Sequence, residues 1–227
     1  MDVFGMALSD YYQRQIDEIL WLHNSYDDPE EMPIDIFFRS YDEMPKLEHI
    51  AMDLCRGKVL DVGAGVGSHA LVLQKKGIDV TAIDISPIAV QVMNHRGVKK
   101  ALEQDIFSLD AKYDTLLFLM NGIGITGTLI GFTAFLGKAE QLINTGGQLI
   151  FDSSNIFYLY EDLPKPSNKY FGEVSYQYEY GQQKGKWFDW LYLDQQTLVS
   201  ISQQQGWNCE IIFDDGEDQY LARLTKS

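Results

Sequence analysis

Hydrophobic and polar residues follow one another in two different patterns, and the change falls near Gly57. Residues 7–23 carry apolar side chains at steps of three and four, which predicts an amphipathic helix. An acidic connection with two prolines follows, and residues 47–54 again have helical periodicity. We therefore expect residues 1–50 to form an N-terminal helical cap, and residues 51–227 to form the main domain.

From Gly57 onward, short apolar runs alternate with helical segments. The expected strands are 58–62, 78–83, 98–103, 113–120 and 148–152, and the expected helices between them are 68–76, 87–96 and 131–143. Such alternation predicts an α/β fold in which a doubly wound, mostly parallel sheet is covered by helices on both faces. Sheets of this kind bind ligands at the carboxyl ends of their strands.

Beyond Asp152 this alternation stops. Residues 155–193 are predicted to be an insertion, irregular at first and then forming a β-hairpin from 173–180 and 186–193. Alternate positions of the hairpin are aromatic, so one side either walls a pocket for an apolar or planar molecule or packs on its own sheet or a second subunit. A helix at 195–205 and two strands at 207–213 and 219–224 are expected to complete the chain.

The composition limits the classes of partner. The chain has 227 residues, 45% of them hydrophobic, and a net charge of −15 at pH 7. An acidic chain without a cluster of Lys or Arg repels phosphate backbones, so we expect no nucleic-acid partner. No apolar run is long enough for a membrane span, and the first residues lack the pattern of a secretory signal, so we expect a cytoplasmic protein with no membrane contact. The two cysteines, Cys55 and Cys209, predict neither a disulfide framework nor a metal site.

The first predicted strand runs into the sequence KVLDVGAGVG at 58–67, where Asp61 is followed by Gly63, Gly65 and Gly67. Glycines permit tight turns and let a ligand approach the backbone, and the helix that follows presents free N–H groups at the same place. The dinucleotide fingerprint G-x-G-x-x-G would need glycine at the position of Ser68. This difference counts against a nicotinamide-dependent oxidoreductase.

Two carboxylates follow the next two predicted strands. Asp84 stands 21 residues beyond Gly63 at the end of a strand, where it can accept hydrogen bonds from both hydroxyls of a ribose and would repel a 2′-phosphate. Asp105 follows the third strand, where its carboxylate can accept from the exocyclic amine of an adenine. These positions predict an adenosine-containing ligand.

The glycine loop, Asp84 and Asp105 together closely resemble the motifs of the class I S-adenosylmethionine-dependent methyltransferases, across roughly residues 45–152 and, in pattern only, 194–226. The resemblance implies a seven-stranded sheet with an antiparallel C-terminal hairpin, and S-adenosylmethionine as the cofactor. It also implies a set of cofactor-binding residues: the loop Gly63, Ala64, Gly65 and Gly67 along the methionine part with Asp61 in support, Asp84 on the ribose, Ile85 on the adenine face, Asp105 and Ile106 on the adenine edge, and Met120 and Asn121 between the methionine and the substrate.

Methyl transfer from a sulfonium is an in-line displacement that requires alignment and exclusion of water, so the sequence need not contain a catalytic dyad. If the reaction uses a general base or an orienting group, the candidates are Asn121, Asp152, His69 and Tyr41. Arg39 and Tyr41 belong to the segment 36–44, which we expect to fold over the cofactor and contact the substrate. The predicted function is methyl transfer to a small-molecule acceptor by a monomer or homodimer. The alternatives are a catalytically idle protein that binds the same cofactor and an NAD-dependent oxidoreductase.

Overall fold

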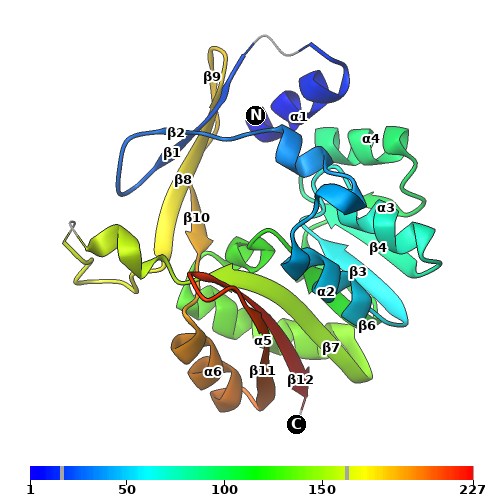
Figure 1. Ribbon diagram of the computed structural model, residues 1–227, viewed down its shortest axis with the longest axis vertical. Helices are drawn as coiled ribbons and strands as arrows, with labels where there is room; N and C mark the ends of the chain where they lie inside the picture. Colours follow the sequence, from blue (N-terminus) through cyan, green and yellow to red (C-terminus); the bar gives the residue numbers. More distant parts are fainter. Residues whose placement is uncertain (16–17, 162–163, 227) are drawn as a thin grey trace.

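Two sheets form the framework of the molecule in a computed structural model that describes residues 1–15, 18–161 and 164–226 (Figure 1). The larger sheet has seven strands in the order β11-β12-β7-β6-β3-β4-β5. Its five strands from β3 to β7 are parallel, and β12 pairs antiparallel with both β7 and β11. The predicted doubly wound fold with an antiparallel C-terminal hairpin is therefore confirmed.

The elements of this larger unit agree with the segments expected from the sequence to within a few residues. Its strands are β3 (Lys58–Val62), β4 (Asp79–Asp84), β5 (Ala101–Glu103), β6 (Tyr113–Phe118), β7 (Ile143–Ser154), β11 (Trp207–Asp214) and β12 (Gln219–Lys226). Its helices are α2 (Lys46–Leu54), α3 (Ser68–Lys75), α4 (Pro87–Arg96), α5 (Leu129–Leu142) and α6 (Gln195–Gln204), and its short 3-10 turns are η3 (Ile106–Ser108), η4 (Gly122–Thr126) and η5 (Ile156–Tyr160).

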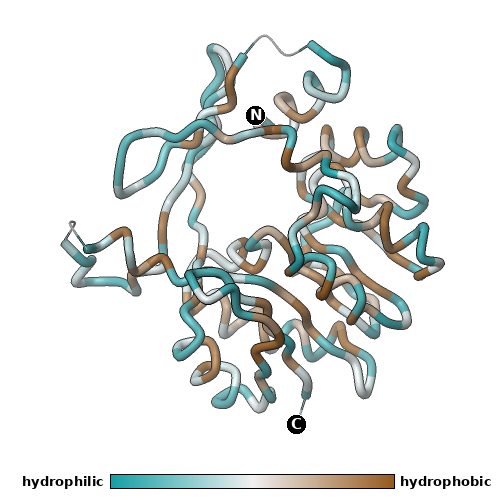
Figure 2. The backbone as a smooth tube through the Cα atoms, viewed as in Figure 1, coloured by the Kyte–Doolittle hydropathy of each residue, from teal (hydrophilic) through white to brown (hydrophobic). Residues whose placement is uncertain are grey.

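Both faces of the larger sheet are buried by helices. Leu60 and Val62 of β3 point to the face covered by α5 and α6, while Val59 points to the face covered by α2, α3 and α4. This alternation follows from the two-residue period of a strand, and it explains why these strands are apolar at almost every position. Figure 2 shows the contrast between these strands and the hydrophilic connection from β1 to β2.

The smaller sheet combines the predicted insertion with the N-terminal segment. Its order is β10-β8-β1-β2, and β9 also pairs with β8. The predicted hairpin is confirmed, because Phe188 lies opposite Tyr176 and Trp190 opposite Val174. The strands are β1 (Leu20–Asn24), β2 (Glu30–Glu31), β8 (Glu173–Tyr180), β9 (Gln183–Lys184) and β10 (Phe188–Leu191).

The prediction of one helix over 7–23 is wrong. Helix α1 (Val3–Tyr12) begins earlier, where the Asp2 carboxylate accepts a hydrogen bond from the Gly5 N–H, and it ends before Arg14, which has a φ of +60°. Residues 20–24 form β1 instead, because this segment pairs antiparallel with β8 along its whole length. Residues 16–17, which the helix prediction also covered, and residues 162–163 of the predicted insertion lie outside the described part of the chain.

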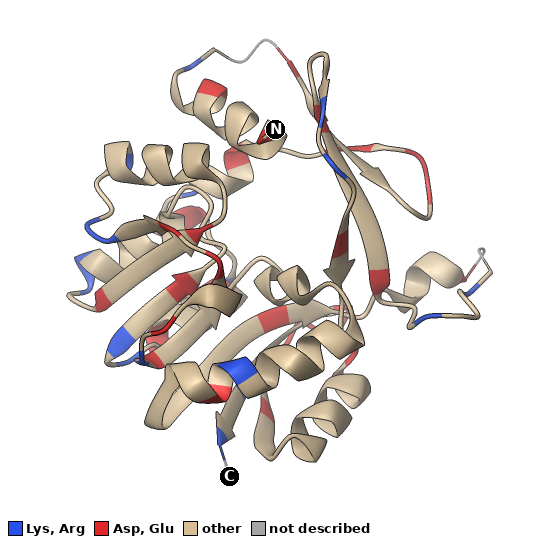
Figure 3. Ribbon diagram, turned by 180° about the vertical axis from the view of Figure 1, so that it is seen from behind, with Lys and Arg blue, Asp and Glu red and all other residues tan. Residues whose placement is uncertain are grey.

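The connection from β2 to the larger sheet contains two 3-10 turns, η1 (Asp35–Phe38) and η2 (Tyr41–Glu43). The N-terminal segment is therefore helical only in part. Acidic residues occur on both sheets (Figure 3). Among the helices that the structure describes, none is long and apolar enough to cross a membrane.

Candidate functional site

A cavity of about 910 Å³ lies between the two sheets. The larger sheet contributes the carboxyl ends of β3, β4 and β6 with the loops that follow them, and the other side comes from α1, η1, β8 and β10. This volume lies near the upper end of the roughly 300–1,000 Å³ that is typical of small-molecule sites. The cavity therefore stands where a doubly wound sheet is expected to bind a ligand.

The glycine loop forms one wall of this cavity. Gly63 and Gly65 have φ values of +65° and +54°, and a Cβ atom built on either one would meet nothing within 4 Å. The backbone is therefore open to close approach from the cavity side. Gly67 has a different role: it does not line the cavity, and a Cβ there would lie 2.7 Å from the Val98 side chain. The absence of a side chain at Gly67 is required for α3 to pack against the segment that follows α4.

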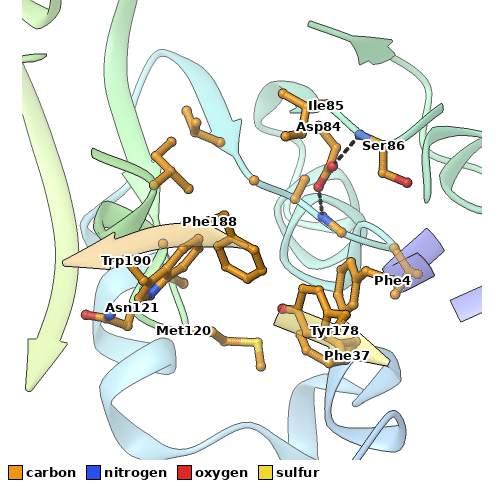
Figure 4. A pocket seen from close by; sticks show the side chains of 18 of the residues that line it. Phe4, Phe37, Asp84, Ile85, Ser86, Met120, Asn121, Tyr178, Phe188 and Trp190 are labelled. Atoms are coloured by element: carbon orange, nitrogen blue, oxygen red, sulfur yellow. Dashed lines mark hydrogen bonds between the residues drawn. The ribbon is translucent and has the colours of Figure 1, made fainter. Parts of the chain in front are cut away.

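Asp84 ends β4 and faces the cavity (Figure 4). One carboxylate oxygen accepts the Gly65 N–H at 2.8 Å, and the other accepts the Ser86 N–H at 2.8 Å. Burial raises the pKa of Asp84 to about 6, and the two backbone N–H groups act in the opposite direction. The carboxylate is thus fixed in one orientation, with lone pairs left over for hydroxyl groups of a ligand.

A buried cluster of charges adjoins the loop. Glu48 of α2 accepts from Arg39 at 2.6 Å and bonds the His69 Nε2 atom at 2.7 Å. Burial alone would lower the pKa of His69, but the hydrogen bond to Glu48 and the charges of Asp61 and Glu48 outweigh it and raise the pKa. The pairing with Glu48 therefore favours the protonated form of the imidazole. The Arg39 Nε atom and the Asp61 Oδ2 atom are buried without a hydrogen-bond partner, and both residues line the cavity.

Three predicted adenine-side residues lie near the mouth of the cavity. Ile85 is 75% exposed there, whereas Ile106 is buried in the wall. Asp105 caps η3 by accepting the Phe107 N–H at 2.9 Å, which leaves its other carboxylate oxygen free. All three residues line the same cavity as Asp84.

Met120 and Asn121 follow β6 and both adopt positive φ, at +59° and +54°. Non-glycine residues rarely take this conformation, and two in succession turn the chain sharply at the cavity wall. Two hydrogen bonds hold the Asn121 side chain, since it donates to the Leu191 carbonyl at 3.3 Å and accepts from Ser153 at 2.9 Å. Its backbone N–H donates to Asp152 at 2.9 Å. Asn121 therefore ties β10 to the larger sheet.

Two of the predicted catalytic candidates do not line the cavity. Asp152 is buried behind Asn121, and burial raises its pKa to about 6. Tyr41 lies on the outside, where its ring stacks on His49 with centroids 4.2 Å apart and Lys76 covers it. The expected contact between Tyr41 and the substrate is absent from this arrangement. Arg39, by contrast, reaches the cavity from the same segment.

The sequence did not indicate that the N-terminus reaches this site. Phe4 of α1 lies 5.0 Å from the ring centroids of both Phe37 and Tyr178, and Figure 4 shows the three rings grouped together. Asp2 accepts a hydrogen bond from the Ser86 hydroxyl at 2.5 Å, next to Asp84. The aromatic residues of segment 36–44 and of the hairpin were visible signals, but Phe4 lay outside the helix predicted from periodicity.

Comparison with known proteins places this geometry in a family. Residues 42–210 match the family described as "Methyltransferase domain". The crystal structure of an S-adenosylmethionine-dependent methyltransferase from Bacteroides fragilis in complex with S-adenosyl-L-homocysteine is similar along all of this chain and 95% of its own, with 41% identity and a TM-score of 0.91.

Curated relatives are more distant. A ubiquinone biosynthesis O-methyltransferase of Xanthomonas oryzae is 23% identical over 158 residues, which are 66% of this chain and 64% of that protein. A demethylmenaquinone methyltransferase of Tropheryma whipplei is 31% identical over 102 residues, which are 41% of this chain and 40% of that protein. The chain thus matches less than two thirds of the length of these relatives.

Proposed function

The chain belongs to the methyltransferase-domain family, and from that premise we propose that it transfers the methyl group of S-adenosylmethionine to a small molecule bound between its two sheets. The observation that carries this proposal is the fixed carboxylate of Asp84 beside the open glycine loop. A carboxylate held by two backbone N–H groups is a suitable acceptor for the two hydroxyls of a ribose.

The other residues around this carboxylate fit the same cofactor. Gly63 and Gly65 offer an open backbone surface for its methionine part, and the unpartnered Oδ2 atom of Asp61 is suited to its ammonium group. Ile85, Asp105 and Ile106 line the part of the cavity that we assign to the adenine, and Met120 lines the cavity just beyond β6. When bound, S-adenosylmethionine supplies a methyl group on a sulfonium that a nucleophile can displace.

The protein's part in the reaction is mainly to position the reactants and exclude water. Phe4, Phe37 and Tyr178 close one side of the cavity, and the aromatic residues of β10 close another. A cavity that holds the acceptor in line with the methyl group supplies much of the rate enhancement of a displacement.

None of the four side chains considered as catalytic has the geometry of a general base. His69 is bonded to Glu48, which raises the pKa of His69, and the Asn121 side chain makes two hydrogen bonds to its own protein. Asp152 and Tyr41 stand outside the cavity lining. We assign His69, Asn121 and Asp152 positioning roles, and infer that the acceptor presents its nucleophile without help from these residues.

The size of the cavity favours an enzyme over a catalytically idle protein that only binds the cofactor. An idle protein would be expected to have little room beside the methyl group, whereas this cavity of about 910 Å³ extends from Asp84 to the aromatic strands β8 and β10. A nicotinamide cofactor has less support, because Ser68 lies where the dinucleotide fingerprint requires glycine, and its hydroxyl donates to the Phe37 carbonyl at 2.6 Å.

Calorimetry with S-adenosylhomocysteine and NAD tests the proposal directly. We expect S-adenosylhomocysteine to bind with a dissociation constant in the micromolar range, of the order of −8 kcal/mol, and NAD to show no heat of binding. Binding of NAD without binding of S-adenosylhomocysteine would overturn the proposal.

The proposal also assigns a role to each segment of the chain. Residues 51–227 form the methyltransferase domain, and residues 1–50 together with the insertion 155–193 form the substrate side, which is supported by the pairing of β1 with β8. We place the protein in the cytoplasm as a monomer or homodimer. Both free cysteines fit a reducing compartment. Cell fractionation and analytical ultracentrifugation measure these two properties.

A further inference from the structure

The smaller sheet turns an aromatic wall toward the end of the cavity where Met120 and Asn121 lie. Phe188 and Trp190 of β10 have ring centroids 6.0 Å apart in an edge-to-face arrangement, and Tyr176 lies 6.2 Å from Phe188. All three line the cavity, and Figure 4 places Phe188 and Trp190 beside Met120 and Asn121. We call Tyr176, Phe188, Trp190 and Tyr192 the aromatic wall.

Few of the charged side chains that line the cavity are free to hold an anion. Asp84 and Asp61 are acidic themselves, and the Arg39 guanidinium is paired with Glu48. Near the aromatic wall, the charged lining residues are Lys186 and Asp189, which are both exposed and opposite in sign. An anionic ligand buried against this wall would lose its hydration without gaining a buried cation in return.

Two hydroxyl groups of the wall and the neighbouring Tyr26 hydroxyl form a row of hydrogen bonds. The donor and the acceptor of each bond can be deduced. The Tyr26 hydroxyl donates to Glu30 at 3.4 Å, because a carboxylate has no hydrogen to give. Tyr26 also lies 3.4 Å from the Tyr176 hydroxyl, which lies 3.2 Å from the Tyr192 hydroxyl. Burial raises the pKa of Tyr26, Tyr176 and Tyr192, so all three stay protonated with one hydrogen each.

Counting the hydrogens then shows which hydroxyl oxygen can still accept a hydrogen bond from a ligand. Since Tyr26 gives its hydrogen to Glu30, Tyr176 must give its own to Tyr26, and Tyr192 must give its own to Tyr176. The oxygen of Tyr192 is left with a lone pair, and Tyr192 lines the cavity. The Tyr192 hydroxyl therefore favours a ligand that donates a hydrogen bond to it.

We propose that the acceptor is an uncharged molecule with a flat aromatic ring that packs on the aromatic wall and donates an O–H or N–H hydrogen bond to the Tyr192 hydroxyl. Aromatic rings pack favourably edge to face or offset on other rings, and a buried polar group discriminates strongly against a ligand that leaves it unpaired. The inference rests on the methyltransferase function proposed above and names the class of its substrate.

Three small molecules with the same ring and substitution pattern test the charge and the hydrogen bond separately. They are 4-methylcatechol, 3,4-dihydroxybenzoate, in which a carboxylate replaces the methyl group, and 3,4-dimethoxytoluene, which has no hydrogen to donate. Each is titrated into the full chain saturated with S-adenosylhomocysteine, with heat or tryptophan fluorescence as the signal. We expect 4-methylcatechol to bind at least tenfold more tightly than either of the other two, which corresponds to about 1.4 kcal/mol.

Two matched variants separate recognition from a general loss of structure. Tyr192→Phe keeps the ring and should bring 4-methylcatechol down to the affinity of 3,4-dimethoxytoluene without changing the binding of S-adenosylhomocysteine. Tyr158→Phe makes the same chemical change at a half-exposed residue outside the cavity lining, and should behave like the natural protein.

Other outcomes overturn the proposal. They are equal or tighter binding of 3,4-dihydroxybenzoate, a preference for 4-methylcatechol that survives Tyr192→Phe, and no binding of 4-methylcatechol up to about 10 mM, the limit of a specific small-molecule site. Failure of S-adenosylhomocysteine itself to bind would instead count against the methyltransferase function, so the two failures are distinguishable.

Discussion

At the scale of single residues, the proposed cofactor site depends most on Asp84, which the Gly65 and Ser86 N–H groups hold in place. We predict that Asp84→Ala weakens the binding of S-adenosylhomocysteine tenfold or more, about 1.4 kcal/mol, through loss of charge-assisted hydrogen bonds to the ribose. Calorimetry at about pH 8 measures the change, where the carboxylate is ionised. Asp79→Ala, at the exposed start of the same strand, serves as the control. Unchanged affinity in Asp84→Ala would remove this residue from the site.

The raised pKa of Asp84, about 6, gives cofactor binding a pH dependence. Below this pH the carboxyl carries a proton and loses the charge that strengthens its bonds to ribose hydroxyls. We predict that the affinity for S-adenosylhomocysteine falls as the pH drops through about 6, and that Asp84→Asn, already weak, shows a flatter profile. The measurement is a calorimetric series between about pH 5 and pH 8. A profile of the natural protein that stays level across this range would contradict the assignment. Asp61, with a pKa of about 6, accounts for any slope that remains in the variant.

The buried carboxylate of Asp152 makes the stability of the folded protein depend on pH. Its pKa is raised to about 6 by burial, whereas an unfolded aspartate titrates near 3.9. The folded protein therefore binds more protons than the unfolded chain between these two values, and Asp152 lowers the free energy of unfolding as the pH rises through this window. Asp152→Asn removes that term, so we expect its stability relative to the natural protein to increase by about 1 kcal/mol from pH 5 to pH 8.

Urea unfolding at each pH measures this difference. Asp110→Asn, at an exposed position, controls for the change in net charge and should show no such trend. A difference between Asp152→Asn and the natural protein that is independent of pH would contradict the prediction.

The sequence predicted that Asp84, Asp105 and the glycine loop come together at one cavity, because the ends of strands can be recognised from it. Each of them follows an apolar run, and a parallel sheet brings such ends together. The contacts of an individual side chain cannot be predicted from the sequence in this way. Tyr41 was placed on the substrate by its position in a predicted lid, yet its ring packs outside against His49. The pairing of Glu48 with His69 joins helices that the sequence gives no reason to connect.

At the scale of secondary structure, the difficulty lay in the N-terminal segment. The sequence LWLHN at 20–24 has apolar residues that fit either a helix or a strand, and only its pairing with β8 settles the question. That partner lies more than 150 residues away along the chain, as the bond between His23 and Glu179 illustrates. Long-range pairing of this kind overrides local periodicity, which is why the second sheet could not be foreseen beyond its hairpin.

The turn η4 packs closely against strand β10 at Gly124. A Cβ atom on Gly124 would lie 2.1 Å from the Trp190 Nε1 atom, so Gly124→Ala must displace the indole. We predict a loss of about 1–3 kcal/mol in the free energy of unfolding, the usual cost of overpacking, together with a shift in tryptophan fluorescence. Gly137→Ala is the control: this glycine is exposed within α5 with nothing within 4 Å of its added Cβ, and the substitution should stabilise by about 0.5–1 kcal/mol. Equal effects of the two substitutions would contradict the fit.

At the scale of the whole molecule, the smaller sheet and α1 close over the strand ends of the larger sheet. The hydrogen bond from Ser86 to Asp2 joins the cofactor corner to the start of α1, and the same Asp2 side chain caps that helix. Phe4 then carries the connection to Tyr178 on β8. From these contacts we expect occupation of the Asp84 corner and closure of α1 to be coupled.

This coupling predicts that Asp2 controls the release of the cofactor product. Asp2→Ala removes a helix cap worth about 1 kcal/mol and the bond from Ser86, so α1 should open more often. We expect S-adenosylhomocysteine to dissociate several-fold faster in stopped-flow fluorescence, and residues 3–12 to exchange their amide hydrogens faster than in the natural protein. Ser9→Ala, near the other end of the same helix and outside the cavity lining, should change neither rate. If exchange in α1 accelerates while dissociation stays unchanged, the helix opens without affecting the site, and the coupling between α1 and the Asp84 corner is refuted.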